Sequence, residues 1–502
     1  MLAHFVIYEN NAYLGSVEAH FCACSLRFYV RNIKVDAKEE YFISVVNFIY
    51  FYVLTNIKEQ NMFKQKNIDG EFTFHKKAFC LLLAMVPVSL IATSTNAAED
   101  KLKTTAPNVV SDSSLNMRLI NEYRNADKPS AAPPNGPKVD AWTQGVMFDF
   151  KSGKVADVVG VESNLYRVQK LSADPDKSTR WYLDGHDSFN LAGVAAVLDF
   201  APAAQFKVGR FGTDAGYGSL KYPVPLIHSA SQRVMPTMAE GVLWQGDFVD
   251  ELHLYAMYAR AYSGGFITDW TDEYAYDLDK TPRYNLAGVW DSGALQLMLG
   301  AQHQQDTLNQ YMTRGSYTWG VGDNAKMKAE GLGLYARTTG AASDILSAKG
   351  LDDTYLVTAK LSYIFDKTTL FASVGHTGDK LPNRSLRLDT DYTFPFDLSI
   401  DRNLQDMLSL QAGVNYNILP TTTLGVALLA TDGYEDYTKA VAVEGKSVNF
   451  SAMHMVNSGP LKGFKAMAIL NKAKEYREGS ALGDTLNYYD VKIRFSYDLP
   501  VF

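Results

Sequence analysis

The last strand-like segment of the chain constrains its fold more than any other feature. From Tyr489 to Leu499 the odd positions are all apolar or aromatic and the even positions are all polar. Alternation of apolar and polar residues with a period of two predicts a β-strand with one apolar face and one polar face in contact with water. The segment is longer than most strands of soluble sandwiches and is about as long as a tilted strand that crosses an outer membrane. We expect the odd face to meet lipid, and Asp490, Lys492 and Arg494 to face a lumen.

The end of this strand has one irregularity. Pro500 has no backbone N–H, and Phe502 falls on the opposite parity from Leu499. A bulge at Pro500 could restore the alternation, since proline is tolerated at strand ends. We expect the barrel-assembly machinery to recognise this C-terminal strand.

A secretory signal peptide is predicted upstream. His75-Lys76-Lys77 precedes the apolar run 78–92, and the small residues 93–98 follow, which favours cleavage before Ala98. We assign 62–97 to the signal peptide, 98–114 to an N-terminal periplasmic segment and 115–502 to a barrel. Residues 1–61 are interpreted as an upstream extension that is not native. The alternative is an N-terminal anchor at 41–54, although that run is shorter than the roughly 20 residues of a spanning helix.

Cysteine content and charge limit the function classes. All three cysteines, Cys22, Cys24 and Cys80, precede the predicted cleavage site, so the exported chain has no disulfides. The net charge of −7 argues against a nucleic-acid partner. The high aromatic content, with 30 Tyr and 26 Phe, fits strands that alternate lipid-facing and lumen-facing side chains.

Turn chemistry predicts an all-β, transmembrane, antiparallel up-and-down β-barrel. Short Gly, Pro, Asn, Asp and Ser turns join strand pairs, and longer polar segments separate the pairs. One of these turns is expected near Gly246-Asp247. Seven short turns imply 16 strands, and the wide gap between the turns at 292 and 367 is expected to contain an eighth turn, which makes 18. The strands within 300–350 cannot be placed from the sequence.

The mature chain carries none of the common catalytic or metal-binding motifs. Its histidines show no pairing at metal-ligand spacing, and neither H-E-x-x-H, nor G-x-S-x-G, nor a P-loop pattern occurs. The acidic segment 269–279 resembles a solvated loop more than a calcium site, because it lacks a defined ligand spacing. We therefore expect no enzyme, no cofactor and no metal site.

Several short motifs resemble those of OprD-type outer-membrane porins, a family that includes chitoporins. Residues 142–153 are similar to an early hairpin of the family that begins with Trp and ends in Ser-Gly. Residues 231–241 are similar to the segment S-x-R-x-x-P-x-x-x-x-G, and Val208-Gly209-Arg210 and the start of the last strand also match. The resemblance implies an 18-stranded monomeric or homotrimeric porin with a narrow constriction and a file of basic side chains.

Candidate pore-lining residues follow from the resemblance and from alternation. Arg233 matches the family motif, and Lys360 points inward if Tyr355 and Leu361 point outward. Arg260 and Tyr222 are further candidates. Arg210 requires a bulge, because strict alternation places it on the face of Phe206 and Val208.

The expected function is passive, substrate-preferring diffusion of amino acids, carboxylates or oligosaccharides across the outer membrane. The expected partners are small solutes, outer-membrane lipids and lipopolysaccharide. Two alternatives stay open: a plugged barrel that serves as an adhesin or structural protein, and an outer-membrane hydrolase.

Overall fold

A computed structural model gives the fold of the chain. The residues it describes are 2–9, 12–22, 25–30, 112–127, 138–155, 157–173, 186–201, 204–213, 220, 222–226, 234, 236–264, 267–271, 282–347, 353–380, 394–400, 404–435, 437–480 and 483–502. The chain divides into two compact units, 1–101 and 102–502.

The first unit contains a small antiparallel sheet in the order β1 (Leu2–Glu9), β2 (Ala12–Cys22) and β3 (Ser25–Val30). The predicted signal peptide, 62–97, lies outside the described residues. The interpretation of 1–61 as a non-native extension therefore stays a prediction.

The second unit is a closed antiparallel barrel of 18 strands, which confirms the predicted fold and sets the 16-strand alternative aside. Its strands are β4 (Ser114–Asp127), β5 (Lys138–Lys151), β6 (Val159–Ala173), β7 (Ser188–Ala201), β8 (Ala204–Gly212), β9 (Met238–Val249), β10 (Leu252–Gly264), β12 (Arg283–Asp291), β13 (Leu295–Gln304), β14 (Leu308–Val321), β15 (Ala325–Thr338), β16 (Asp353–Phe365), β17 (Thr368–Thr377), β18 (Gln405–Leu419), β19 (Thr422–Tyr434), β20 (Ala442–Met455), β21 (Phe464–Tyr476) and β22 (Thr485–Pro500). A short strand, β11 (Ile267–Thr271), adds to the end of β10.

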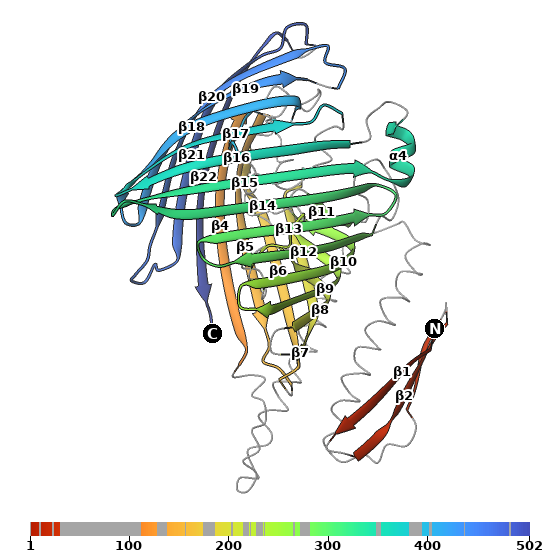
Figure 1. The fold of residues 1–502 in the computed structure, drawn as a ribbon. Coiled ribbons are helices and arrows are strands. Elements are labelled where there is room, and N and C mark those ends of the chain that lie inside the picture. The colour runs from red at the N-terminus through yellow and green to blue at the C-terminus, as the bar shows by residue number, and fades with distance from the viewer. Residues whose placement is uncertain are drawn as a thin grey trace. The chain divides into compact units, whose positions relative to one another are not determined.

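The barrel closes where its last strand pairs with its first. β22 runs beside β4 in an unbroken register from Tyr489 opposite Asp127 to Pro500 opposite Asn116. Figure 1 shows these neighbours, with blue β22 beside orange β4. We call this pairing the closing seam. Because the ends of the sheet pair with each other, the barrel has no exposed strand edge at this position.

Most strand pairs follow the predicted alternation of short and long connections, but β13 and β14 are joined at the long-connection end by residues 305–307 alone. The eighth short turn lies at 322–324 between β14 and β15, where Gly322 has a φ of 68°. The turn expected near Gly246-Asp247 was placed too early: β9 continues to Val249 and turns at Asp250 and Glu251. The pairing of Gly246 with Leu254 explains the error, since this glycine is part of a regular ladder and not of a turn.

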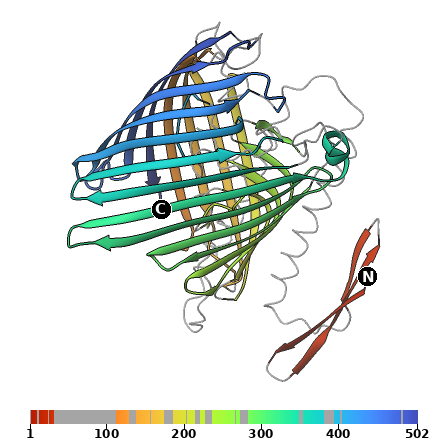
Figure 2. The same cartoon turned by 45° about the horizontal axis from the view of Figure 1, so that its top comes forward.

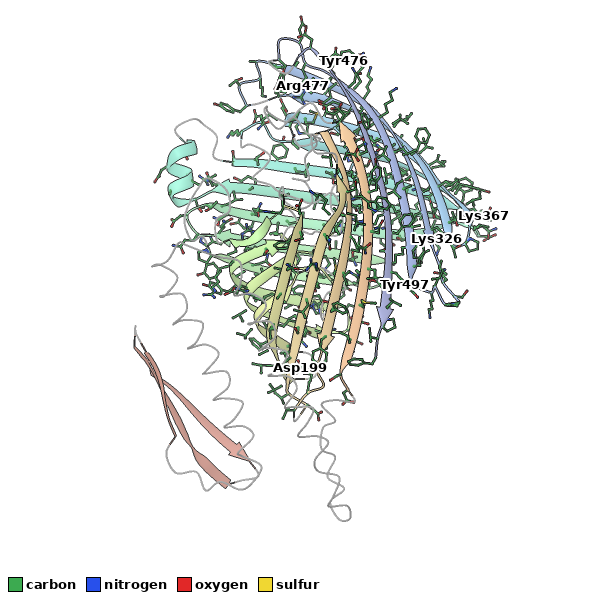
Figure 3. All side chains as sticks on the ribbon, turned by 180° about the vertical axis from the view of Figure 1, so that it is seen from behind. Asp199, Lys326, Lys367, Tyr476, Arg477 and Tyr497 are labelled. Atoms are coloured by element: carbon green, nitrogen blue, oxygen red, sulfur yellow. The ribbon has the colours of Figure 1, made fainter. Side chains whose placement is uncertain are left out.

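The two ends of the barrel are distinct. Asp199, Lys326 and Lys367 lie toward the short turns, and Tyr476 and Arg477 lie at the opposite end (Figure 3). The one helix among the described residues, α4 (Gly340–Ser347), follows β15 at the long-connection end (Figure 2). No helix in the described part of the chain is long and apolar enough to cross a membrane.

The closing strand runs through Pro500 without the bulge expected there. The irregularity comes after the proline: the Val501 N–H donates to the carbonyl of Leu115 (2.7 Å), and the Leu115 N–H donates to the carbonyl of Phe502 (3.1 Å). Val501 and Phe502 thus both pair with Leu115, which is the two-against-one arrangement of a β-bulge. The missing N–H of Pro500 is tolerated because it lies at the end of the strand.

Side chains alternate between the outer and inner walls. On β22, Tyr489 and Phe495 are exposed, whereas Asp490 and Lys492 are buried inside the barrel. Aromatic rings on the outer wall gather at two levels. Tyr258 and Tyr284, Tyr311 and Tyr335, and Tyr355 and His376 form neighbouring pairs toward the long connections, and Tyr317 and Trp319, Tyr363 and Phe365, and Phe464 and Phe495 do so toward the short turns. Such girdles mark the two interfaces of a membrane.

Candidate functional site

The connection between β8 and β9 enters the barrel. Its described residues Leu220, Val224 and Leu226 are buried in one apolar cluster. The cluster also contains inner-wall residues of β10 to β16, which include Tyr255, Met298, Met312, Leu334 and Leu356. Burial of these side chains removes apolar surface from the water of the lumen, which stabilises the inward position. We call residues 220–226 the crossing segment.

Hydrogen bonds hold the crossing segment against the wall. The Tyr222 hydroxyl donates to the carboxylate of Asp291 (3.0 Å). The Tyr222 N–H donates to the Tyr255 hydroxyl (3.2 Å), which donates in turn to the Tyr222 carbonyl (3.1 Å). Asn285 donates to the carbonyl of Pro225 (2.6 Å). Burial, together with the bond to Asp291, raises the pKa of Tyr222 to about 12, so its hydroxyl stays protonated at neutral pH.

The same connection also contacts the inner wall of β4 to β7. Val234 is buried in a second apolar cluster with Ile120 of β4, Met147 of β5 and Leu191 of β7. A Cβ atom at Gly145 would lie 2.9 Å from Cγ1 of Val234, so the glycine makes room for this contact. Since one connection contacts both β10–β16 and β4–β7, it crosses the lumen and narrows it.

A second connection enters from the opposite side. Asp397 lies between β17 and β18, and its Oδ2 accepts hydrogen bonds from Ser447, Asn449 (2.7 Å) and Asn471 (3.0 Å) on the inner wall. Its Oδ1 accepts from the backbone N–H groups of Ser399 and Ile400 (2.7 and 2.8 Å). We call 394–400 the pinned segment.

Lys360 lies on the inner wall of β16 beside the pinned segment. Its Nζ is 5.0 Å from the ring centroid of Phe371 and 5.7 Å from that of Phe394. The carboxylate of Glu330 lies 3.9 Å away and also pairs with Lys328 (2.9 Å). A half-buried cation flanked by two aromatic rings can bind an anionic group and the ring or chain that carries it.

The inner face of the closing seam carries a second group of charges. Glu122 pairs with Arg494 and, at 3.7 Å, with Lys492. Arg124 donates to Asp490 (2.9 Å). Further along the wall Lys207 and Glu162 form a buried pair (2.8 Å). These pairs place fixed charges of both signs on a part of the inner wall away from Lys360, where each carboxylate is paired with a neighbouring cation.

The five sequence-predicted residues fall in different places. Lys360 and Tyr222 lie inside the barrel, and Arg233 lies outside the described residues. Arg210 and Arg260 both pair with Glu240 on the outer wall, so their expected place in the lumen is corrected. The register of β8 and β9 has no bulge, which leaves Arg210 on the face of Val208. Arg260 sits in the irregularity between Ala259 and Ala261 and turns to the same carboxylate.

Asp397 was not among the sequence-predicted residues. Its position depends on Ser447, Asn449 and Asn471, which are 50 to 74 residues away along the chain. No sequence motif around Asp397 predicts these hydrogen bonds.

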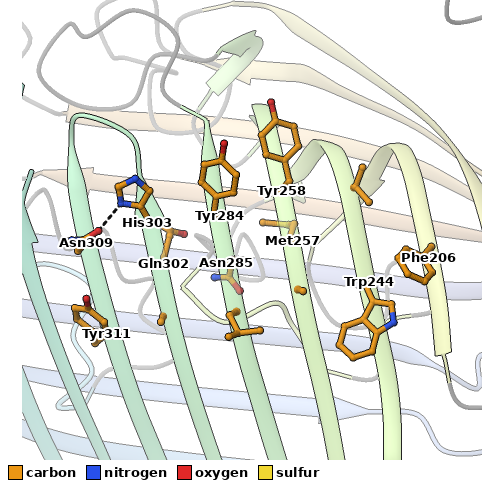
Figure 4. Close-up of a pocket in the computed structure, with 14 residues that line it drawn as sticks. Phe206, Trp244, Met257, Tyr258, Tyr284, Asn285, Gln302, His303, Asn309 and Tyr311 are labelled. Atoms are coloured by element: carbon orange, nitrogen blue, oxygen red, sulfur yellow. Dashed lines mark hydrogen bonds between the residues drawn. The ribbon is translucent and has the colours of Figure 1, made fainter. Parts of the chain in front are cut away.

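A groove of about 570 Å³ lies on the outer wall of β8 to β14 rather than in the lumen. Its lining is largely apolar and aromatic, with Phe206, Trp244, Tyr258, Tyr284 and Tyr311 around it (Figure 4). It arises where the small residues Ala256 and Ala301 stand between larger ones. This lining is typical of a wall that contacts lipid.

The described residues contain no cluster of His, Cys, Asp and Glu side chains able to hold a metal ion. The sequence model of a protein family, the OprD family of outer membrane porins, matches residues 108–491 of this chain. The chain belongs to the OprD family of outer membrane porins. The fold and family are those of channels, which confirms the predicted family.

Among curated proteins, the chain is 38% identical over 399 residues to the membrane-associated protein UidC of Escherichia coli K12, covering 77% of this chain and 92% of UidC. It is 24% identical over 441 residues to the porin-like protein GalP of Pseudomonas putida, covering 82% and 98%. UidC and GalP are thus matched over nearly their whole length.

Solved structures share the fold at lower identity. OccAB3 of Acinetobacter baumannii has a TM-score of 0.64 at 15% identity, covering 78% of this chain and 100% of the other. OpdK of Pseudomonas aeruginosa with vanillate has a TM-score of 0.61 at 20% identity, with the same coverage. OprD porins reside in the outer membrane of Gram-negative bacteria, where the barrel contacts lipid and solutes.

Proposed function

We propose that this porin is a passive channel with a preference for small hydrophilic solutes that carry a carboxylate. The observation that carries the proposal is the position of Lys360, whose ammonium group stands between Phe371 and the pinned segment. A cation at a narrow point lowers the barrier for an anion. Lys360 and Tyr222 are the pore-lining residues of this proposal.

Aromatic carboxylates are a reasonable first class of solute to test. Phe371 and Phe394 present ring faces beside the Lys360 ammonium group, so a ring and its carboxylate could be held together. The structurally similar OpdK was crystallised with vanillate, itself an aromatic carboxylate. Amino acids and oligosaccharides remain the competing classes in the test.

The experiment is solute competition in planar bilayers. Purified barrel is inserted in KCl, and current block is recorded with benzoate-type carboxylates, zwitterionic amino acids and neutral oligosaccharides. We expect carboxylates to block at the lowest concentration, and Lys360→Gln to remove this preference. Arg260→Gln on the outer wall is the matched control. Equal block by all three classes would contradict the preference, and no conductance at all would favour a plugged barrel.

The export and assembly of the chain belong to the same proposal. We infer that residues 62–97 are removed as a signal peptide, that 98–114 lie in the periplasm, and that the C-terminal strand is read by the barrel-assembly machinery. The family match begins at residue 108, after the predicted cleavage site, which supports this division. Intact mass of the membrane-extracted protein tests it, because a mature N-terminus upstream of Met62 would contradict it. Cross-linking in membranes distinguishes the monomer from the homotrimer.

A further inference from the structure

Three lysines gather on the outer wall near the long connections. Lys446 of β20 is the direct cross-strand partner of Lys474 of β21, and Lys472 is the next outward residue along β21. All three side chains are exposed and alternate with the buried inner-wall residues Ser447, Ala473 and Glu475. We call Lys446, Lys472 and Lys474 the lysine patch.

The lysine patch lies at the level of the outer leaflet. Lys474 is two residues from Tyr476, which lies at the end of the barrel opposite the short turns (Figure 3). In outer-membrane barrels the short turns are periplasmic and the longer loops are extracellular. The exposed apolar residues Phe450 and Leu470, a direct cross-strand pair, follow below the patch toward the short turns. Along the outer wall, the lysines therefore lie nearer the long connections, and the apolar side chains that face lipid hydrocarbon lie nearer the short turns.

The lysine patch has no direct ion-pair partner within the described part of the chain. No ion pair joins any of the three lysines to a described carboxylate, although the Lys474 Nζ lies 4.5 Å from the ring centroid of Tyr476. The carboxylates of Asp432 and Glu444 are direct cross-strand partners of each other, one step closer to the loops. Like charges placed directly opposite each other destabilise a sheet, so an anion bound from outside would stabilise the Lys446–Lys474 pair.

The arginines of the opposite wall provide a contrast. Arg210 and Arg260 also lie on the outer wall toward the long connections, but the carboxylate of Glu240 stands between them and pairs with both. The positive charge of these two arginines is therefore compensated by a carboxylate of the protein itself. A group of cations that makes no direct ion pair with a neighbouring carboxylate is suited to a ligand that brings its own negative charge.

We propose that the lysine patch binds a phosphate group of lipopolysaccharide, with the acyl chains of that glycolipid lying over Phe450 and Leu470. A phosphorylated glycolipid complements both features of this wall. Its phosphates carry the negative charge that pairs with the three ammonium groups, and its acyl chains can pack on the apolar side chains of Phe450 and Leu470. Lysine near a membrane surface favours anionic headgroups in the same way. The proposal concerns the outer wall and is independent of the channel proposed for the lumen.

The test uses the full-length barrel in detergent with purified lipopolysaccharide as the probe. Bound glycolipid is counted by native mass spectrometry for the wild-type protein and for Lys446→Gln/Lys474→Gln. We expect binding to weaken by about twenty-fivefold, at roughly fivefold for each lysine. Dephosphorylated lipopolysaccharide is expected to bind the wild-type protein as weakly as intact lipopolysaccharide binds the variant.

Two controls make the result decisive. Arg210→Gln/Arg260→Gln removes two cations at a similar level on the other wall and is expected to leave binding within about twofold of wild type. Gel mobility with and without heating reports the folded barrel, and an unchanged single-channel conductance shows that the lumen is intact. Equal retention of lipopolysaccharide by the lysine variant, or equal binding of the dephosphorylated form, overturns the proposal.

Discussion

The ammonium group of Lys360 lies 5.7 Å from the ring centroid of Phe394, although the two residues belong to different parts of the barrel. Lys360 is fixed by the inner face of β16, whereas Phe394 comes from the connection between β17 and β18. The contact therefore links the charge of the wall to a segment that narrows the lumen. We therefore expect the width of the channel and its charge selectivity to depend on the same few side chains.

Asp397→Ala is expected to widen the lumen. The carboxylate accepts hydrogen bonds from Ser447, Asn449 and Asn471, and its loss leaves these donors without their acceptor and releases the pinned segment. Single-channel conductance should rise and become noisier. Asp432→Ala on the outer wall is the control, and an unchanged conductance for Asp397→Ala would show that the segment is held by other contacts.

Gly145→Val should alter the conductance through Val234. A Cβ atom added at position 145 would lie 2.9 Å from Cγ1 of Val234, closer than side chains tolerate. The larger residue must displace the connection that crosses the lumen, and Val234→Ala in the same chain should restore much of the original conductance. Gly331→Ala meets only Thr358 at 3.8 Å and serves as the matched control. Failure of the second substitution to restore conductance would argue that the two residues are not coupled.

Tyr222→Phe should make the crossing segment less firmly held. The substitution removes the hydrogen bond to Asp291, which contributes about 1 kcal/mol, or roughly a fivefold change in the population of released states. Brief current fluctuations should increase accordingly, and Tyr317→Phe on the outer wall should not change them.

The hydrogen bond between Tyr222 and Asp291 also predicts how the current fluctuations of the channel depend on pH. The pKa of Tyr222 is raised to about 12 from its usual 10, so the stabilisation is present below pH 10 and is lost as pH rises through 12. Fluctuations of the wild-type channel should stay constant from pH 6 to 9. A marked increase within that range would assign them to another group.

Glu122→Gln should weaken the closing seam. The Glu122 carboxylate is buried on the inner wall with Arg494 and Lys492, and removing one partner of a buried ion pair costs about 3 kcal/mol. The fraction of folded barrel, followed by gel mobility during heating, should fall at a lower temperature than in the wild type. Asp432→Asn provides the exposed control. Identical melting of Glu122→Gln and wild type would mean that backbone pairing alone holds the seam.

Alternation made most of the fold predictable, and it also sorted Lys360, Lys492 and Arg494 to the inner wall. A period of two needs only local sequence, which is why strands and their faces could be recognised. Arg260 could not be placed in this way, because it sits in a local irregularity of β10. The paths of the crossing and pinned segments depend on distant partners such as Tyr255 and Asn471, which no local pattern reports.

The charge selectivity of the wild-type barrel and of Lys360→Gln tests the central claim most directly. Reversal potentials are measured across a planar bilayer with a tenfold KCl gradient, with Arg260→Gln as the outer-wall control. The position of Lys360 predicts that Lys360→Gln shifts the reversal potential toward cation preference and that Arg260→Gln leaves it unchanged. An unchanged reversal potential for Lys360→Gln would contradict the assignment of the constriction to Lys360 and the pinned segment.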